Sequence, residues 1–99
     1  MEEAMAVGLR LKFAGGGQEQ YEAVHRHMNV DGDPPDGLIF HMAGPIDDGF
    51  GVIDCWESRQ QFDTFVENRL GPAVQELGDQ ALPGPPDIRE FPVANFTKP

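Results

Sequence analysis

Two ionisable residues, His41 and Asp54, lie inside stretches that otherwise predict the interior of a β-sheet. Ionisable side chains are seldom buried in strands without a partner. An imidazole hydrogen-bonded to a carboxylate has one tautomer fixed and its basicity raised, which suits it to take a proton from a phenol or an activated C–H group. We therefore consider His41 as a general base and Asp54 as the group that orients it. The sequence leaves open the alternative of a buried pair that serves only structure.

The residues around this pair predict a hairpin followed by a helix. Residues 38 to 43 and residues 50 to 56 alternate between two sets of side chains, which is the two-residue period of a strand. The segment 44 to 49 is rich in Gly, Pro and Asp and predicts the turn between them. Ser58 then predicts a helix N-cap, with Gln61 three positions later as in a capping box. The two candidate residues therefore belong to adjacent antiparallel strands.

The register of this hairpin determines whether the pair can meet. Placing the apolar sides of the two strands on one face, with the turn centred on Asp47 and Asp48, sets His41 directly opposite Asp54. A slip by two residues makes the pair diagonal but keeps both side chains on one face. The same register predicts three further pairs, which are Met42 with Ile53, Phe40 with Cys55, and Ile39 with Trp56.

Arg10 and Trp56 are expected on the face that carries the His–Asp pair. By alternation along the first strand, Arg10 could anchor a substrate carboxylate or phenolate, or else form an ion pair with Asp54 or a surface carboxylate. Trp56 could stack on a planar aromatic ligand, although an aromatic residue at a strand end can also be plain core. Both are therefore candidate substrate-binding residues.

A predicted helix over residues 18 to 28 supplies two more candidates. Tyr21 is the single tyrosine of the chain, and His25 follows it by four positions, one turn along the same helix face. His25 and His27 are two positions apart and point in different directions, so they cannot hold one ion together. We expect solvent exposure for both histidines, with His25 able to line the mouth of a pocket beside Tyr21.

Other chemistries have weaker support in the sequence. There is no Cys/His cluster with zinc spacing, and the paired aspartates favour turns rather than a calcium loop; these are Asp31, Asp33, Asp47 and Asp48. Cys55 lies on an apolar strand face, where a nucleophilic role is not expected. The GGG run of residues 15 to 17 lacks the G-x-G-x-x-G pattern. We expect neither a metal nor a cofactor.

The remaining elements predict one α+β domain over residues 1 to 99. Alternation predicts a first strand, residues 5 to 13, and Pro92 marks a last strand, residues 88 to 96, as an edge or bulged one. Residues 29 to 37 are a Pro- and Asp-rich loop. Gly71 and Pro72 interrupt the helix that begins after Ser58, and a short helix resumes until Gly78. The predicted order is strand, helix, strand, strand, helix, strand.

The amino-acid composition argues against several classes of binding partner for this protein. Seven Lys and Arg against 17 Asp and Glu give a formal charge of −10 without a basic stripe, which argues against nucleic acid and anionic membranes as partners. No apolar run approaches ~20 residues, so we expect no membrane span. Cys55 is the single cysteine, which excludes an internal disulfide and favours a cytoplasmic location. A domain of 99 residues has a limited core, so a partner subunit is expected.

This order of elements, with the polar loop 29 to 37, the WES step of residues 56 to 58 and the short helix after Gly71 and Pro72, resembles the dimeric α+β barrel superfamily. More narrowly, it is similar to the antibiotic biosynthesis monooxygenase-like branch, over roughly residues 7 to 96. The resemblance implies a ferredoxin-like, four-stranded antiparallel sheet with helices on one face. It also implies a homodimer in which two such sheets form a barrel. Apolar residues on both faces of the predicted sheet agree with this.

The members of this superfamily differ in activity, so the fold alone does not choose among them. They include cofactor-independent quinone-forming monooxygenases, haem-degrading oxygenases, small decarboxylases and cyclases, and stress-response proteins. The monooxygenases commonly have a pocket Trp, and Trp56 is its plausible equivalent, whereas the accompanying Asn and Tyr cannot be located beyond Tyr21 on the first helix. The haem-degrading members carry a histidine ligand on a helix, which the strand-borne His41 does not match. We therefore expect no haem.

Two functions remain as hypotheses. The first is a cofactor-free enzyme that acts on an aromatic or polyketide-like small molecule, as a monooxygenase or as an acid/base catalyst of cyclisation, isomerisation or decarboxylation. In this hypothesis His41 is the base, Asp54 orients it and Trp56 stacks on the substrate. The second is a non-catalytic ligand-binding or stress-associated homodimer in which the His–Asp pair is structural.

Overall fold

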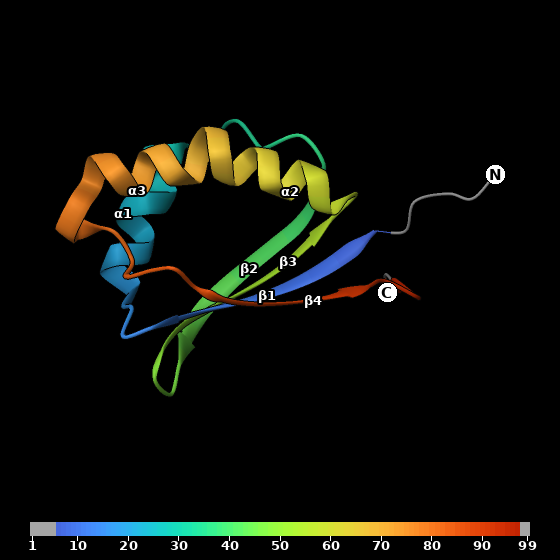
Figure 1. Ribbon diagram of the computed structural model, residues 1–99, viewed down its shortest axis with the longest axis horizontal. Helices are drawn as coiled ribbons and strands as arrows, with labels where there is room; N and C mark the ends of the chain where they lie inside the picture. Colours follow the sequence, from blue (N-terminus) through green and yellow to red (C-terminus); the bar gives the residue numbers. More distant parts are fainter. Residues whose placement is uncertain (1–5, 98–99) are drawn as a thin grey trace.

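Four strands form one antiparallel sheet in the computed structural model, which describes residues 6–97. The strands are β1 (Val7–Ala14), β2 (Leu38–Ile46), β3 (Gly49–Trp56) and β4 (Asp87–Pro92). Their order across the sheet is β2-β3-β1-β4, so β1 and β3 are central and β2 and β4 are edges. All helices lie on one side of this sheet (Figure 1). The predicted ferredoxin-like α+β fold is confirmed.

The helical layer consists of α1 and one longer, nearly continuous helical segment that runs across the sheet (Figure 1). Its elements are α1 (Gln18–Met28), α2 (Arg59–Phe65), the π-helical turn η1 (Val66–Leu70), α3 (Gly71–Leu77) and the 3₁₀ turn η2 (Gly78–Gln80). The bounds of α1 match the prediction. The Ser58 hydroxyl accepts a hydrogen bond from the Gln61 backbone N–H at 3.2 Å, which confirms the predicted N-cap of α2.

The predicted interruption of the second helix at Gly71 and Pro72 is wrong in its position. Gly71 has helical φ and ψ angles of −57° and −52°, and the hydrogen-bonding pattern changes one turn earlier, in η1. The chain stays helical because Pro72 falls in the first turn of α3, where its missing N–H costs little. The helix ends at Gly78, whose φ of 58° favours glycine.

Two strand ends differ from the prediction. β2 continues through Pro45 to Ile46 because β2 is an edge strand, where a residue without an N–H is tolerated. β4 ends at Pro92 rather than continuing to residue 96, and it pairs only with β1, which confirms its predicted place at an edge. Met5, the predicted start of the first strand, lies outside the described residues.

The register of the β2–β3 hairpin agrees with the prediction along most of its length. His41 pairs with Asp54, Phe40 with Cys55 and Met42 with Ile53. The predicted pairing of Ile39 with Trp56 is wrong, because a bulge between Leu38 and Phe40 places Leu38 opposite Trp56 instead. The bulge turns Leu38 toward the core and leaves Ile39 on the surface with 42% of its area exposed.

The register between β1 and β3 decides which side chains share a face. Leu9 pairs with Asp54, whereas Arg10 pairs with Ile53. Directly opposed residues point to the same side of a sheet, so Leu9 and Asp54 face the helices while Arg10 points to the other face. The prediction that Arg10 shares a face with Asp54 is therefore wrong. Val52, which pairs with Leu11, also lies on the helix side.

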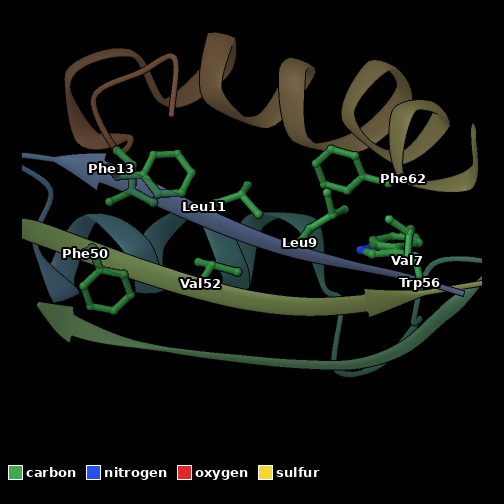
Figure 2. Packing of buried hydrophobic residues seen from close by; sticks show 9 residues of the cluster. Val7, Leu9, Leu11, Phe13, Phe50, Val52, Trp56 and Phe62 are labelled. Atoms are coloured by element: carbon green, nitrogen blue, oxygen red, sulfur yellow. The ribbon is translucent and has the colours of Figure 1, made fainter. Parts of the chain in front are cut away.

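The hydrophobic core lies between the helix-facing side of the sheet and the helices. Figure 2 shows Phe62 of α2 reaching from the helical layer toward Leu9 of the sheet. The buried members of this cluster come from β1, β3, α2 and the segment before β4; they are Val7, Leu9, Leu11, Phe13, Phe50, Val52, Trp56, Phe62 and Leu82. Asp54 is the one buried charged residue within the described part of the chain, and it lies in the same layer.

Leu9 tests this arrangement because only 1% of its surface is exposed. We expect Leu9→Ala to lower the free energy of unfolding by roughly 2–5 kcal/mol, since the substitution removes buried methyl groups and leaves a cavity. The exposed Gln60 on α2 provides the control. Gln60→Ala is expected to change stability by less than about 0.5 kcal/mol. Urea denaturation followed by circular dichroism measures both, and equal effects of the two substitutions would contradict the assigned core.

Candidate active site

The predicted contact between His41 and Asp54 is present. The Nδ1 atom of His41 lies 2.6 Å from the Oδ1 atom of Asp54, across the β2–β3 ladder. Six per cent of the Asp54 side chain is exposed, against 24% of the His41 side chain. A carboxylate accepts hydrogen bonds and cannot donate them, so Nδ1 of His41 carries the proton of this bond. The tautomer of His41 is thereby set by Asp54.

Trp56 donates a hydrogen bond to the other oxygen of the Asp54 carboxylate. Its Nε1–H donates to Oδ2 of Asp54 at 3.1 Å, so each carboxylate oxygen has its own donor. The indole ring packs against Phe62 and Phe65 at centroid distances of 5.7 and 5.4 Å, and only 1% of Trp56 is exposed. The observed contacts of Trp56 are therefore those of a residue that positions Asp54. The spacing of two residues along one strand, with an indole N–H that needs a partner, could have indicated this bond.

Tyr21 of α1 is hydrogen-bonded to the second nitrogen of the His41 imidazole. Its hydroxyl oxygen lies 2.5 Å from Nε2 of His41, and the two rings are stacked at a centroid distance of 5.9 Å and an interplanar angle of 10°. The tyrosine ring also stacks on Phe50 of β3 at 4.8 Å, which holds it on the sheet. Both ring nitrogens of His41 are thus engaged, one by Asp54 and one by Tyr21.

The hydrogen-bonded series continues from Tyr21 to the molecular surface. Nδ1 of His25 is hydrogen-bonded to the Tyr21 hydroxyl oxygen at 3.2 Å, and Nε2 of His25 makes an ion-pair contact with Oδ1 of Asp31 at 3.1 Å. Side-chain exposure is 20% for His25 and 88% for Asp31. We call the five residues of this series the polar chain; they are Asp54, His41, Tyr21, His25 and Asp31. It connects a buried carboxylate to an exposed one.

A small cavity lies beside the polar chain, between the sheet, α1 and the helical segment above it. Its volume is about 60 Å³ and its walls are mostly apolar, with contributions from Val52, Phe65 and Leu70. Tyr21, His25, His41, Asp54 and the predicted pocket residue Trp56 also line it. An apolar cavity of ~150 Å³ binds benzene and one water needs at least ~10–15 Å³, so this space fits a few water-sized molecules or dioxygen as it stands. An aromatic ring enters only when neighbouring side chains move.

Burial makes the Tyr21 phenol harder to ionise. Removal from water, together with the negative charges of Asp54 and Asp31, raises the pKa of Tyr21 from 10.0 to about 12. The hydroxyl therefore keeps its proton at neutral pH and acts as a hydrogen-bond donor and acceptor rather than as a tyrosinate. Cys55 lies outside this site, on the other face of the sheet, and burial raises the pKa of its thiol, which leaves it unreactive.

Arg10 does not belong to the site. It points away from the helices, and its Nη2 atom lies 3.0 Å from Oδ2 of Asp87 on β4. This is the surface ion pair that the sequence left open as the alternative to substrate binding. The prediction that Arg10 anchors a substrate beside His41 and Asp54 is wrong, because the β1–β3 register places Arg10 on the other face of the sheet. Alternation along one strand cannot reveal this register.

The structure adds contacts that the sequence did not predict. Tyr21 and His25 were candidates for lining a pocket, and both do so, but their bonds to His41 and Asp31 depend on how α1 docks on β2. Asp31 was interpreted only as a turn former. His27, in contrast, points to the surface as expected and pairs with Glu76 of α3 at 2.6 Å. The i, i+4 spacing of Tyr21 and His25 was the available signal.

Comparison with known proteins confirms the fold. No family model matches the sequence, and no curated protein matches it. Among solved structures, a protein of unknown function from Nitrosomonas europaea superposes with a TM-score of 0.67 at 13% identity, covering 99% of this chain and 98% of that one. A dimeric ferredoxin-like protein of unknown function from Thermobifida fusca gives 0.65 at 12% identity, with 94% and 95% covered.

The cofactor-independent oxygenase SnoaB from Streptomyces nogalater is similar over almost the whole chain. The TM-score is 0.62 at 20% identity, covering 97% of this chain and 99% of SnoaB. These likenesses confirm the predicted resemblance to dimeric α+β barrel and monooxygenase-like proteins at the level of the fold. At such identities they carry no information on substrate or mechanism. Within residues 6–97, no helix has the length and apolarity needed to cross a membrane.

The ionisation of Tyr21 can be measured directly because it is the single tyrosine. We expect ultraviolet difference absorbance to give a midpoint near pH 12 rather than the ordinary 10.0. The unfolded chain loses this proton near pH 10 and the folded chain retains it, so the free energy of unfolding falls as pH rises through that interval. Circular dichroism at each pH identifies the range in which the protein is folded.

Two substitutions identify the cause of this shift. Asp54→Asn and Asp31→Asn each remove a negative charge that opposes ionisation of Tyr21, so each should lower the midpoint. Asp63→Asn, on the exposed face of α2, is the control and should leave the midpoint unchanged. A midpoint near 10 in the folded wild-type protein would contradict the buried, charge-flanked position of Tyr21.

Proposed function

We propose that this protein is a cofactor-independent enzyme that removes a proton from an aromatic or polyketide-like small molecule. The supporting observation is the pair of His41 and Asp54, held in one tautomer at the wall of an apolar cavity. Perturbed or buried ionisable groups at a cavity are common marks of an active site. His41 is the base in this proposal, and Asp54 orients it and stabilises the imidazolium that forms.

The proposed reaction begins at an acidic phenol or at a C–H group next to a carbonyl. Its proton passes to the unit formed by His41 and Tyr21, and the electron pair stays on the substrate as a phenolate or enolate. In the oxygenase form, this electron-rich substrate reduces dioxygen, so that a CH₂ group becomes a carbonyl and the second oxygen atom leaves as water. In the acid/base form, the same anion cyclises, isomerises or loses carbon dioxide, and the proton returns to carbon.

The remaining site residues have supporting roles in this proposal. Tyr21 and His25 bind the polar end of the substrate at the cavity, and Phe65 and Leu70 contact its rings. Trp56 acts through Asp54, because its N–H is committed to that carboxylate. The small volume of the cavity means that substrate entry requires outward movement of the helical segment or of the loop before β2. SnoaB, a cofactor-independent oxygenase of the same fold, supports the oxygenase form by analogy alone.

A non-catalytic ligand-binding or stress-associated protein is the second candidate function. The observation in its favour is that both nitrogens of His41 are already hydrogen-bonded, so the network is complete without a ligand. Within residues 6–97, every buried side-chain nitrogen and oxygen has a partner. A fully satisfied polar network can serve structure alone.

We further propose that the protein is a cytoplasmic homodimer formed through the sheet face that carries no helix. Four apolar side chains lie on this face according to the strand registers; they are Phe40, Met42, Ile53 and Phe91, with 37%, 60%, 39% and 59% of their surface exposed. Exposed large apolar side chains that share one face mark an interaction site. The Thermobifida fusca protein of the same fold is dimeric, which supports a second copy as the partner.

The enzymatic proposal predicts oxygen-dependent or oxygen-independent turnover of probes such as anthrone, which has an activated CH₂ group, and the phenol 1-naphthol. His41→Gln should lower this turnover by about 10²–10⁴-fold, because it removes the base. Product formation by absorbance and oxygen consumption by an electrode measure the two forms of the reaction. His27→Gln, which alters an equivalent histidine–carboxylate pair on the surface, should retain wild-type turnover.

Thermal unfolding of the same variants separates catalysis from structure. A folded His41→Gln protein that has lost turnover supports the catalytic role. A probe panel without turnover by the wild type, or equal loss of stability and activity in His41→Gln, would favour the second candidate function.

The homodimer predicts a concentration-dependent mass of twice the chain in sedimentation equilibrium. Met42→Asp places a charge on the apolar face and should shift the protein to monomer, because an unpaired buried charge is costly. Gln60→Asp, on the exposed side of α2, is the control and should remain dimeric. A wild-type protein that stays monomeric at micromolar concentration would contradict the proposed interface.

A further inference from the structure

We propose that Tyr21, His25 and Asp31 form a proton relay that carries the proton collected by His41 out to solvent. This inference deepens the proposed function and rests on it for its role in turnover. It is supported by three hydrogen bonds in series, with distances of 2.6, 2.5 and 3.2 Å from Asp54 to His25, and by an ion-pair contact of 3.1 Å between Nε2 of His25 and Oδ1 of Asp31. Tyr21 is the shared link between the two histidines.

Counting protons shows why the polar chain is suited to transfer. Both of its ends are carboxylates, which accept hydrogen bonds when ionised and have no proton to donate. The three hydrogen bonds need three protons, and two neutral imidazoles and one phenol supply all three. A proton taken from the substrate is therefore an additional one, and either histidine can accept it.

The additional proton can reside on either of two residues, His41 or His25. In the first arrangement His41 is the imidazolium and donates to both Asp54 and the Tyr21 oxygen, while the Tyr21 O–H donates to Nδ1 of His25. In the second, His25 is the imidazolium and donates to both Tyr21 and Asp31, while the Tyr21 O–H donates to Nε2 of His41. Every bond is satisfied in both arrangements.

One paired shift converts the first arrangement into the second. The Nε2 proton of His41 moves to the Tyr21 oxygen as the original hydroxyl proton moves to Nδ1 of His25. No atom other than hydrogen moves, no electron is transferred, and the positive charge passes from His41 to His25. The Nε2–H of His25 then releases its proton to Asp31 or to water. The raised pKa of Tyr21 is consistent with a hydroxyl that passes protons without remaining ionised.

The geometry gives the relay a direction. Side-chain exposure is 6% at Asp54, 24% at His41, 20% at His25 and 88% at Asp31, so of the two ends of the polar chain Asp31 is the one in bulk water. The His25 and His41 rings lie 5.7 Å apart, close enough for two positive charges to repel. This repulsion favours one additional proton rather than two. The groups that face the histidines within the polar chain are Asp54, Tyr21 and Asp31.

A double-substitution cycle read by nuclear magnetic resonance tests the relay without a substrate. The ring ¹⁵N shifts of His25 report its proton occupancy at a single neutral pH. In the wild-type background, Asp54→Asn should change these shifts, because it alters the sharing of the proton through Tyr21. In the Tyr21→Phe background, which keeps the ring and its packing, the same substitution should leave the His25 shifts unchanged. The His27 ring, paired with Glu76, is the internal control.

A kinetic experiment with anthrone tests the role of the relay in turnover. His25→Gln and Asp31→Asn leave the contact between His41 and Asp54 in place, so we expect a several-fold drop in turnover at low buffer concentration. Added imidazole should restore the rate in both variants by accepting the proton from the interior. Loss of packing alone would not respond to a buffer, so this rescue distinguishes a relay from a structural role.

The outcomes separate this inference from the proposed function. His25 shifts that ignore Asp54→Asn in the wild-type background, or relay variants that turn over anthrone at the wild-type rate in low buffer, would overturn the relay while the enzymatic proposal stands. If the wild type turns over no probe, the proposed function fails. The resonance cycle then still decides whether the polar chain shares one proton.

Discussion

The burial of one carboxylate, that of Asp54, is the constraint on which the site depends. A charged group removed from water must recover its lost solvation from hydrogen-bond donors placed around it. Trp56 supplies a donor from the same strand and His41 supplies one from the neighbouring strand. The first contact fixes the indole within the core, and the second ties the edge strand β2 to β3 at one register. Packing of the helices over this layer then depends on a side chain that most cores exclude.

The residues that hydrogen-bond to Asp54 need further hydrogen-bond partners of their own, closer to the surface. His41 uses one nitrogen for the carboxylate and therefore presents the other to α1, where Tyr21 meets it. The Tyr21 hydroxyl can both donate and accept a hydrogen bond, so it needs a second partner, and His25 provides one a helical turn away. Each hydrogen bond thus creates the need for the next as far as His25, which contacts the exposed Asp31 at the surface. A core that needed only stability would have been simpler with apolar residues at these positions, which is why the series favours a functional interpretation.

The two faces of the sheet have different physical roles. The face under the helices combines the core with the cavity and the polar chain, whereas the other face exposes aromatic and aliphatic side chains that a second copy would cover. Gly8 contributes to the second face, because a Cβ atom at this position would lie 2.6 Å from the Phe91 ring. Absence of a side chain there lets Phe91 lie flat across β1. The ferredoxin-like fold separates the proposed chemistry from the proposed assembly by the thickness of one sheet.

Much of this arrangement follows from the sequence by itself. Strand alternation, the Asp47–Asp48 turn and the Ser58 cap are local features, and together they determined the hairpin, the pairing of His41 with Asp54 and the start of α2. The tertiary structure alone decided the rest. Alternation within β1 cannot reveal its register with β3, so the predicted face of Arg10 was wrong. A bulge between Leu38 and Phe40 changed the predicted partner of Trp56 from Ile39 to Leu38. The docking of α1 brought Tyr21 to His41, which lies 20 residues away in the sequence. Such contacts depend on long-range packing, which only the assembled core can establish.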